Sequence, residues 1–335
     1  MNSIRFMLDP TTGTLGEDDA KSYFSRFGWF AFAFYLSLSL FQTAVEFLVS
    51  TFAPELYDNA LFLQIFSVVQ IYAFAFPVAY AILRPLPTVK PVGEKMRVKE
   101  LLLAACICEA LMLIGNYISS YLLMFFAQAM GGVELQNPVE VSVESQPMWM
   151  TLVFSVILAP LLEEIFFRGV VCKKLLALGE GYAVVLSAAF FALCHGNFFQ
   201  LFYAFVVGCF FGFIYVKTGR LIYTVLLHIT VNFIGTVAVT WVMGRVDYEA
   251  LLEGSFRVTS DNVVGLLILI LYEVLILGAS AIGIATLIKN RKRIKFDEGI
   301  LPPPRYGRVR CVLLSAGIAA AIAVFAFSLI GSLLL

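Results

Sequence analysis

Two adjacent glutamates in the apolar run 148–172 are the first residues whose types and spacing could do chemistry. Glu163 and Glu164 point about 100° apart around a helix, so they cannot serve the same purpose. Glu164 and Arg168 are four residues apart, which is the spacing of an ion pair on one helix face. That pairing would neutralise Glu164 and leave Glu163 as the carboxylate that is free to react.

Both histidines of the chain also lie in apolar segments. His195 ends the run 191–195, and His228 comes four residues before Asn232, on the same helix face. A lone histidine in a membrane helix is usually a hydrogen-bonding residue. Together with Glu163, however, an imidazole can activate a water as a general base, and an amide can stabilise an oxyanion. Glutamate and histidine are also zinc ligands, so the same side chains could hold a divalent metal.

These residues form three motifs in order along the chain: EExxxR at 163–168, FxxxH at 191–195 and HxxxN at 228–232. Over residues 148–243 the chain therefore resembles the CPBP (Abi) intramembrane proteases, which are relatives of the type II CAAX prenyl endopeptidases. Each motif alone is weak, but the ordered trio is specific. The resemblance implies an endopeptidase that hydrolyses a peptide bond within the membrane.

The resemblance also implies roles for six residues: Glu163, His195, His228 and Asn232 in catalysis, and Glu164 and Arg168 in support of the site. Glu163 and His195 would activate the water. His228 and Asn232 would hold the oxyanion. A metal such as zinc, if present, would be held by Glu163, His195 and His228. No HExxH pair fixes a zinc on one helix, so a metal-free mechanism is slightly favoured.

The composition places this site in a membrane. Of the 335 residues, 61% are hydrophobic and only 14% are charged, and the apolar residues come in long blocks typical of membrane spans. This excludes a soluble enzyme and a disulfide-stapled secreted domain. The net charge of zero gives no general attraction to nucleic acid, so we expect membrane lipid and a peptide or protein substrate as partners. Backbone groups in lipid must bond within the protein, which predicts an all-α, multi-pass bundle.

Nine apolar segments give about 8–9 helices, and they lie near 27–52, 61–83, 100–129, 148–172, 182–196, 199–216, 221–243, 262–288 and 311–334. The fifth and sixth are too short for a straight span. We expect four parts along the chain: a cytoplasmic segment 1–26, three helices in 27–129, the catalytic core 148–243, and two helices joined by a basic loop in 262–335.

The positive residues predict the orientation in a cell membrane. Twenty of the 23 lysines and arginines lie in alternate loops, so those loops and the N-terminus should be cytoplasmic. Glu163 would lie about 22 Å along its helix from Met148, and His228 about 10 Å from the inner face. Both depths favour a site that is reached from the cytoplasm. His195 would lie nearer 20 Å from the inner face, which requires a tilted or lowered fifth segment.

Two other classes of function compete with proteolysis. Further polar residues in apolar segments could relay protons in an ion-coupled transporter: Glu46, Glu109, Asn116 and Glu273. A non-catalytic membrane scaffold or a bacteriocin self-immunity protein could also keep this fold. A scaffold should tolerate Glu163→Gln, whereas a protease should not. Nothing in the sequence indicates whether a substrate is prenylated.

Overall fold

The computed structural model describes residues 6–133, 135–247, 250–251, 253–259, 262–304 and 308–334. Within these residues the chain is helical, apart from loops and two isolated β-bridges. Helices satisfy their own backbone hydrogen bonds, which is what a lipid environment demands. The structure therefore confirms the all-α, multi-pass bundle that the apolar blocks predict.

Seven helical segments of the described chain are long and apolar enough to cross a membrane. They are α1 (Glu17–Phe52), α2–η2–α3 (Ala60–Val68, Val69–Ala75, Phe76–Leu83), α4 (Val98–Ala129), α6–η3–α7–η4–α8 (Met148–Met150, Thr151–Leu158, Ala159–Phe166, Phe167–Cys172, Lys173–Leu175), α10 (Phe198–Thr218), α11–η5–α12 (Leu221–Asn232, Phe233–Ala238, Val239–Met243) and α14 (Val263–Asn290). Two shorter apolar helices, α9 (Glu180–Cys194) and α16 (Ala316–Leu334), complete the nine predicted segments.

Aromatic residues hold α1 in the bundle. Phe24, Phe27, Phe30 and Phe34 recur at three- and four-residue intervals, so they share one helix face, and all four are buried. Phe30 stacks on Phe166 of α7 at 5.7 Å between ring centroids. The N-terminal helices therefore pack directly against the helix that carries the two glutamates.

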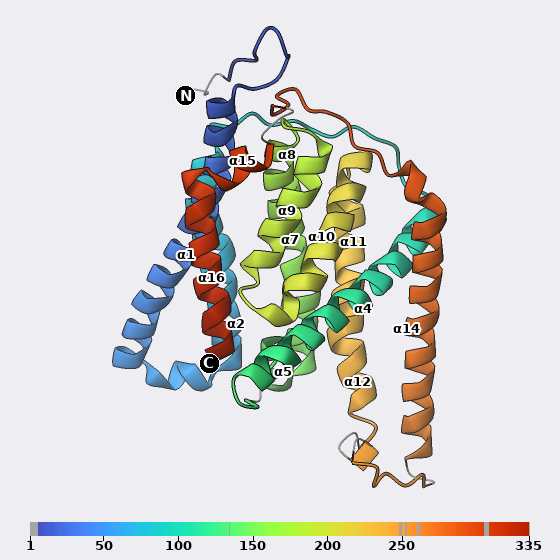
Figure 1. Cartoon of the computed structure of the whole chain (residues 1–335). Coiled ribbons are helices and arrows are strands. Elements are labelled where there is room, and N and C mark those ends of the chain that lie inside the picture. The colour runs from blue at the N-terminus through green and yellow to red at the C-terminus, as the bar shows by residue number, and fades with distance from the viewer. Residues whose placement is uncertain are drawn as a thin grey trace.

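The basic loops gather at one end of the molecule (Figure 1). The backbone N–H of Val89 donates to the carbonyl of Lys173 at 3.0 Å, and that of Leu301 donates to the carbonyl of Ala177 at 2.7 Å. Lys217 pairs with Glu180 at the same end. The alternation seen in the sequence is thus present in space, and we call this the basic end. That it faces the cytoplasm stays a prediction.

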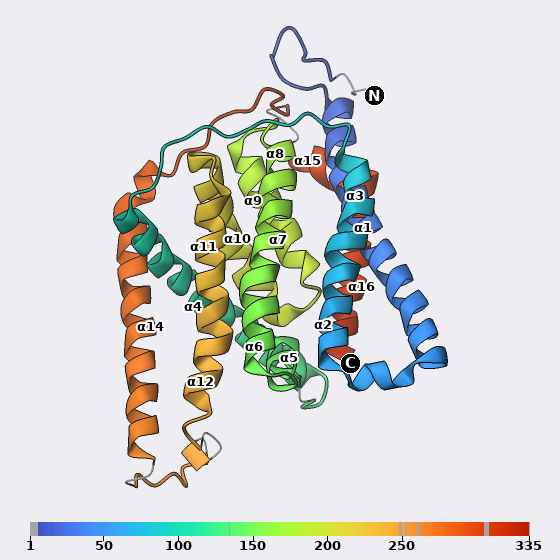
Figure 2. The same cartoon turned by 180° about the vertical axis from the view of Figure 1, so that it is seen from behind.

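The hairpin of α9 and α10 does not cross the whole bundle. α9 has 15 residues, so it rises only about 22 Å from the basic end. It then turns at Gly196, whose φ of +69° is a conformation that favours glycine. The tip of the hairpin lies partway down the bundle, with the diagonal helix α4 and the short helix α5 (Pro138–Glu144) toward the other end (Figures 1 and 2). We call α9, this tip and α10 the lowered hairpin; the depth of His195 in a membrane stays a prediction.

Candidate active site

The two glutamates lie on a short α-helical stretch, α7, between the π-helical stretches η3 and η4. Pro160 occupies the first turn of α7, where its missing N–H leaves the backbone ladder incomplete. π-Helical turns are rare and occur frequently at functional sites. They change the direction in which the side chains before and after α7 point around the helix axis. The four-residue spacing from Glu164 to Arg168 still brings that pair together.

Glu164 and Arg168 form a fully buried ion pair. Nη1 of Arg168 lies 3.1 Å from Oε1 of Glu164, and both side chains have 0% exposure. Nη2 of Arg168 donates to the carbonyl of Gly208 on α10 at 3.0 Å. The guanidinium carbon also lies 4.7 Å from the ring centroid of Phe191 and 5.4 Å from that of Phe211. The pair expected from the sequence is therefore formed, and it ties α7 to its neighbours.

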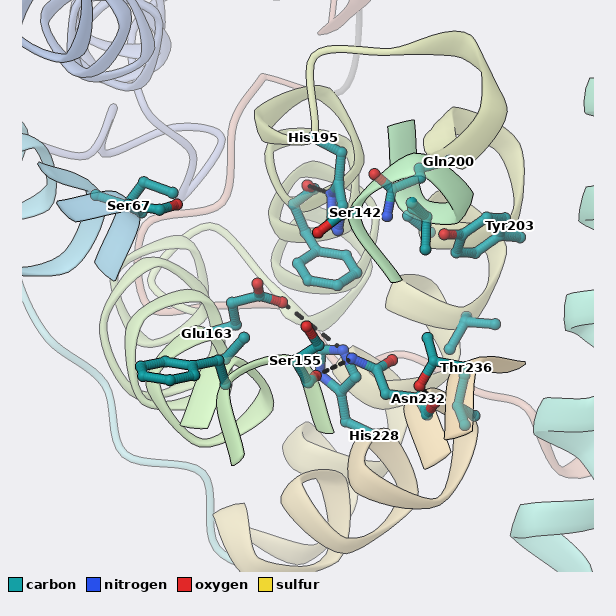
Figure 3. A pocket seen from close by; sticks show the side chains of 18 of the residues that line it. Ser67, Ser142, Ser155, Glu163, His195, Gln200, Tyr203, His228, Asn232 and Thr236 are labelled. Carbon is teal, nitrogen blue, oxygen red and sulfur yellow. Dashed lines mark hydrogen bonds and ion pairs between the residues drawn. The ribbon is translucent and has the colours of Figure 1, made fainter. Parts of the chain in front are cut away.

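His228 of α11 lies between the two carboxylates. Its Nδ1 is 3.1 Å from Oε1 of Glu164, and its Nε2 is 3.7 Å from Oε2 of Glu163 (Figure 3). An ionised carboxylate only accepts hydrogen bonds, so Nδ1 carries the hydrogen and Nε2 is directed at Glu163. A base held by a second group is the usual arrangement around an activated nucleophile. Arg168, Glu164, His228 and Glu163 thus form one continuous chain of contacts.

Glu163 has a further partner outside this chain. The hydroxyl of Tyr72, on η2, donates to Oε1 of Glu163 at 3.0 Å. The carboxylate is 18% exposed, in contrast to the buried Glu164. One oxygen is therefore held by Tyr72, while the other lies near His228 and next to open space.

That space is a cavity of about 340 Å³. All four residues expected to be catalytic line it: Glu163, His195, His228 and Asn232. Nδ1 of His195 donates to the carbonyl of Phe191 at 2.8 Å, which leaves Nε2 available to a ligand. The amide nitrogen of Asn232 donates to the carbonyl of Ser155 at 2.9 Å, which uses one of its two N–H groups. A water occupies about 30 Å³ of liquid, so the cavity has room for water and part of a peptide.

A metal centre at these side chains is the alternative that the sequence left open. Among the described residues, no group of three His, Cys, Asp or Glu side chains could hold a metal ion. A catalytic zinc needs three protein ligands, so Glu163, His195 and His228 in this arrangement do not fit one.

In a comparison with protein families, residues 145–234 match the model of the type II CAAX prenyl endopeptidase Rce1-like family. The matched segment contains all three motifs. Over this segment, the chain is similar to the Rce1-like family. Comparison with curated proteins and with solved structures gives no match. The matched family is of the protease type, and the seven apolar helical segments support a multi-pass membrane protein.

The Rce1-like segment does not contain the whole site. Tyr72 lies in the N-terminal helices, and 91 residues separate it from Glu163. In the sequence it is one of 14 tyrosines and stands in an apolar run, without any spacing that connects it to a motif. Gln200 and Tyr203 also line the cavity and were not singled out. Their place close behind His195, at the start of α10, is a signal that could have found them.

Proposed function

We propose that this protein is an intramembrane endopeptidase in which Glu163 activates a water for attack on a peptide carbonyl. The single observation that carries the proposal is the contact chain from Arg168 through Glu164 and His228 to Glu163, at the wall of a cavity within a helical bundle. If these residues only held the helices together, the buried ion pair of Glu164 and Arg168 would be enough. That role does not explain a second carboxylate, Glu163, that remains partly exposed beside an imidazole.

The reaction begins with Glu163 as general base. Its Oε2 takes a proton from the water, and the water oxygen attacks the carbonyl carbon of the substrate. The carbonyl oxygen then carries the negative charge of the tetrahedral intermediate. When the C–N bond breaks, the proton held by Glu163 passes to the leaving nitrogen, so the products are a carboxylic acid and an amine. His195, with Nε2 available, would hold the water with Glu163.

Asn232 and His228 would stabilise the oxyanion. Asn232 has one N–H left after its bond to Ser155, and amide donors fixed in advance are effective in such sites. His228 would donate to the oxyanion from Nε2 when both of its ring nitrogens carry a hydrogen. Glu164 fixes the orientation of the ring by accepting from Nδ1. These roles agree with those that the family resemblance implies.

We further propose that the mechanism uses no metal, because no three potential ligands converge among the residues that the structure describes. The substrate is a peptide or protein segment, and the enzyme lies in the cell membrane. Helix depth from the basic end was the reason to expect access from the cytoplasm. The side chains that line the cavity instead favour access from the end of the bundle opposite the basic loops.

The decisive experiment compares protein termini in membranes of cells that carry the wild-type protein or Glu163→Gln at matched expression. Glu109→Gln is the matched control, because Glu109 is also a buried membrane carboxylate (7% exposed) but does not line the cavity. We expect new termini with the wild-type protein and with Glu109→Gln, and none with Glu163→Gln. Equal termini in all three strains, with all proteins folded and abundant, would reject proteolysis and favour a scaffold.

A further inference from the structure

The cavity is closed toward the basic end by packed side chains. Directly behind Glu163 and His228 lie Glu164 and Arg168, which are completely buried, and Phe211, also with 0% exposure. This layer contains the ion pair and its aromatic neighbours, so it leaves no passage for a peptide.

A second buried layer lies beyond the first. Leu175 has 0% exposure and Lys174 has 5%, although a lysine near a basic loop would normally reach into water. Nζ of Lys174 instead donates to the carbonyl of Leu86 at 2.6 Å. This contact ties the loop after α3 to the end of the α7 segment. A peptide from the basic end would therefore have to break two layers of packed contacts.

The cavity wall away from the basic end is built differently. It includes residues from α5 and from the second half of α2: Val139, Ser142 and Val143, and Gln64, Ser67 and Val68. α2 begins at Ala60 and α5 lies in the 130–147 connection, and both are at the end opposite the basic loops (Figures 1 and 2). None of these six residues is fully buried, in contrast to the layers behind Glu163.

The lowered hairpin makes this opening possible. Because α9 ends at Cys194, partway down the bundle, His195 and Gly196 do not reach the far end. The space below the tip belongs to the cavity and to α5. The short fifth helix thus exposes the catalytic side chains toward one end only.

The charge at this end of the molecule also favours some peptide substrates over others. The exposed residues Glu140 and Glu144 lie on α5, and the sequence 130–147 contains no lysine or arginine. Inside the cavity, the lining adds Glu163 and two histidines but no basic side chain of the lysine or arginine type. A negative rim attracts cationic peptides and repels acidic ones.

We propose that the substrate enters the cavity from the end opposite the basic loops, past α5, and that it is a neutral or basic peptide segment on that side of the membrane. By the distribution of positive residues, that side is extracytoplasmic. This inference rests on the proposed function for its substrate, but the route of access can be measured without any cleavage.

The test is cysteine labelling in sealed vesicles of both orientations with a charged, membrane-impermeant methanethiosulfonate. Ser142→Cys and Ser67→Cys place the thiol in the cavity wall. Lys90→Cys, in the exposed loop before α4, marks the basic side, and Ser255→Cys marks the opposite side. Peptide mass spectrometry reads each position separately, so the six native cysteines do not interfere.

We expect Ser142→Cys and Ser67→Cys to react from the side on which Ser255→Cys reacts, at least 10-fold faster than from the other side. Reaction from the side of Lys90→Cys would overturn the proposal, and so would a lack of reaction from either side. The same labelling in a Glu163→Gln background should be unchanged. Failure of the access route and failure of proteolysis are therefore distinguished, because labelling reports the first and new termini report the second.

Discussion

Removal of Arg168 should destabilise the whole bundle, because its partner would remain buried. Arg168→Met keeps the length and apolar stem of the side chain but leaves Glu164 with 0% exposure and no guanidinium at 3.1 Å. Breaking a buried ion pair by removing one partner costs about 3–5 kcal/mol. The change also removes the hydrogen bond to the carbonyl of Gly208. Proteins unfold with a free energy of about 5–15 kcal/mol, so this loss is a large part of the total.

The assay is thermal unfolding of the purified protein in detergent, together with folded yield by size exclusion. With about 2–4 °C of melting temperature per kcal/mol, we expect a decrease of roughly 6 °C or more. The matched control is Arg97→Met, which removes an arginine from a three-residue-spaced pair with Glu100 whose side chains are 84% and 42% exposed. Exposed pairs contribute little, so this variant should melt like the wild type.

A double variant separates charge from packing. Arg168→Met with Glu164→Gln leaves no buried charge, so it should recover much of the melting temperature. It should not recover activity, because His228 loses the carboxylate that orients its Nδ1. The reasoning is refuted if Arg168→Met melts at the same temperature as Arg97→Met, or if the double variant melts below the single one.

Three further outcomes are expected. Tyr72→Phe should lower kcat about 10-fold or more at an unchanged melting temperature, since a hydrogen bond to a charged group contributes about 1.5–3 kcal/mol. The control is Tyr80→Phe, a change on the exposed side of the same helical segment. Equal activity of the two variants would reject a role for Tyr72. A zinc chelator such as 1,10-phenanthroline should leave the cleavage rate of the purified protein unchanged, and loss of activity that zinc restores would reject the metal-free mechanism. Glu140→Lys should raise kcat/KM for an acidic peptide and lower it for a basic one, most clearly at low ionic strength; no change at low salt would contradict a rim effect.

The sequence could predict contacts that lie within one helix turn or at one end of a helix. Glu164 and Arg168 are four residues apart on the same helix, so their pairing needs no knowledge of the fold. The basic end follows from loop composition in the same way. The three motifs identified the four residues expected to be catalytic, which all line the cavity, because each motif fits on a single helix or its end.

Contacts between helices could not be predicted from spacing. His228 approaches Glu164 only because α11 packs against α7, and Tyr72 reaches Glu163 only because η2 lies beside the same helix. The π-helical stretches around α7 have no signature in the sequence, since they depend on how the neighbouring helices pack. The sixth segment was expected to be short, but α10 has 21 residues, because Phe198 extends the helix at its start and the polar residues Lys217 and Thr218 extend it at its end.

The 15-residue helix α9 has a consequence for the surrounding lipid. The hydrocarbon core of a bilayer is about 30 Å thick, whereas α9 rises about 22 Å and exposes Val185 (45%) on its outer side. Acyl chains that pack beside α9 contact this helix over only part of that depth, and a bilayer responds to such a mismatch by thinning. A substrate helix that drifts into the thinned patch would lose hydrophobic contact at its end and unwind more easily. Bilayers of short-chain lipid should therefore favour turnover, and thick bilayers should suppress it.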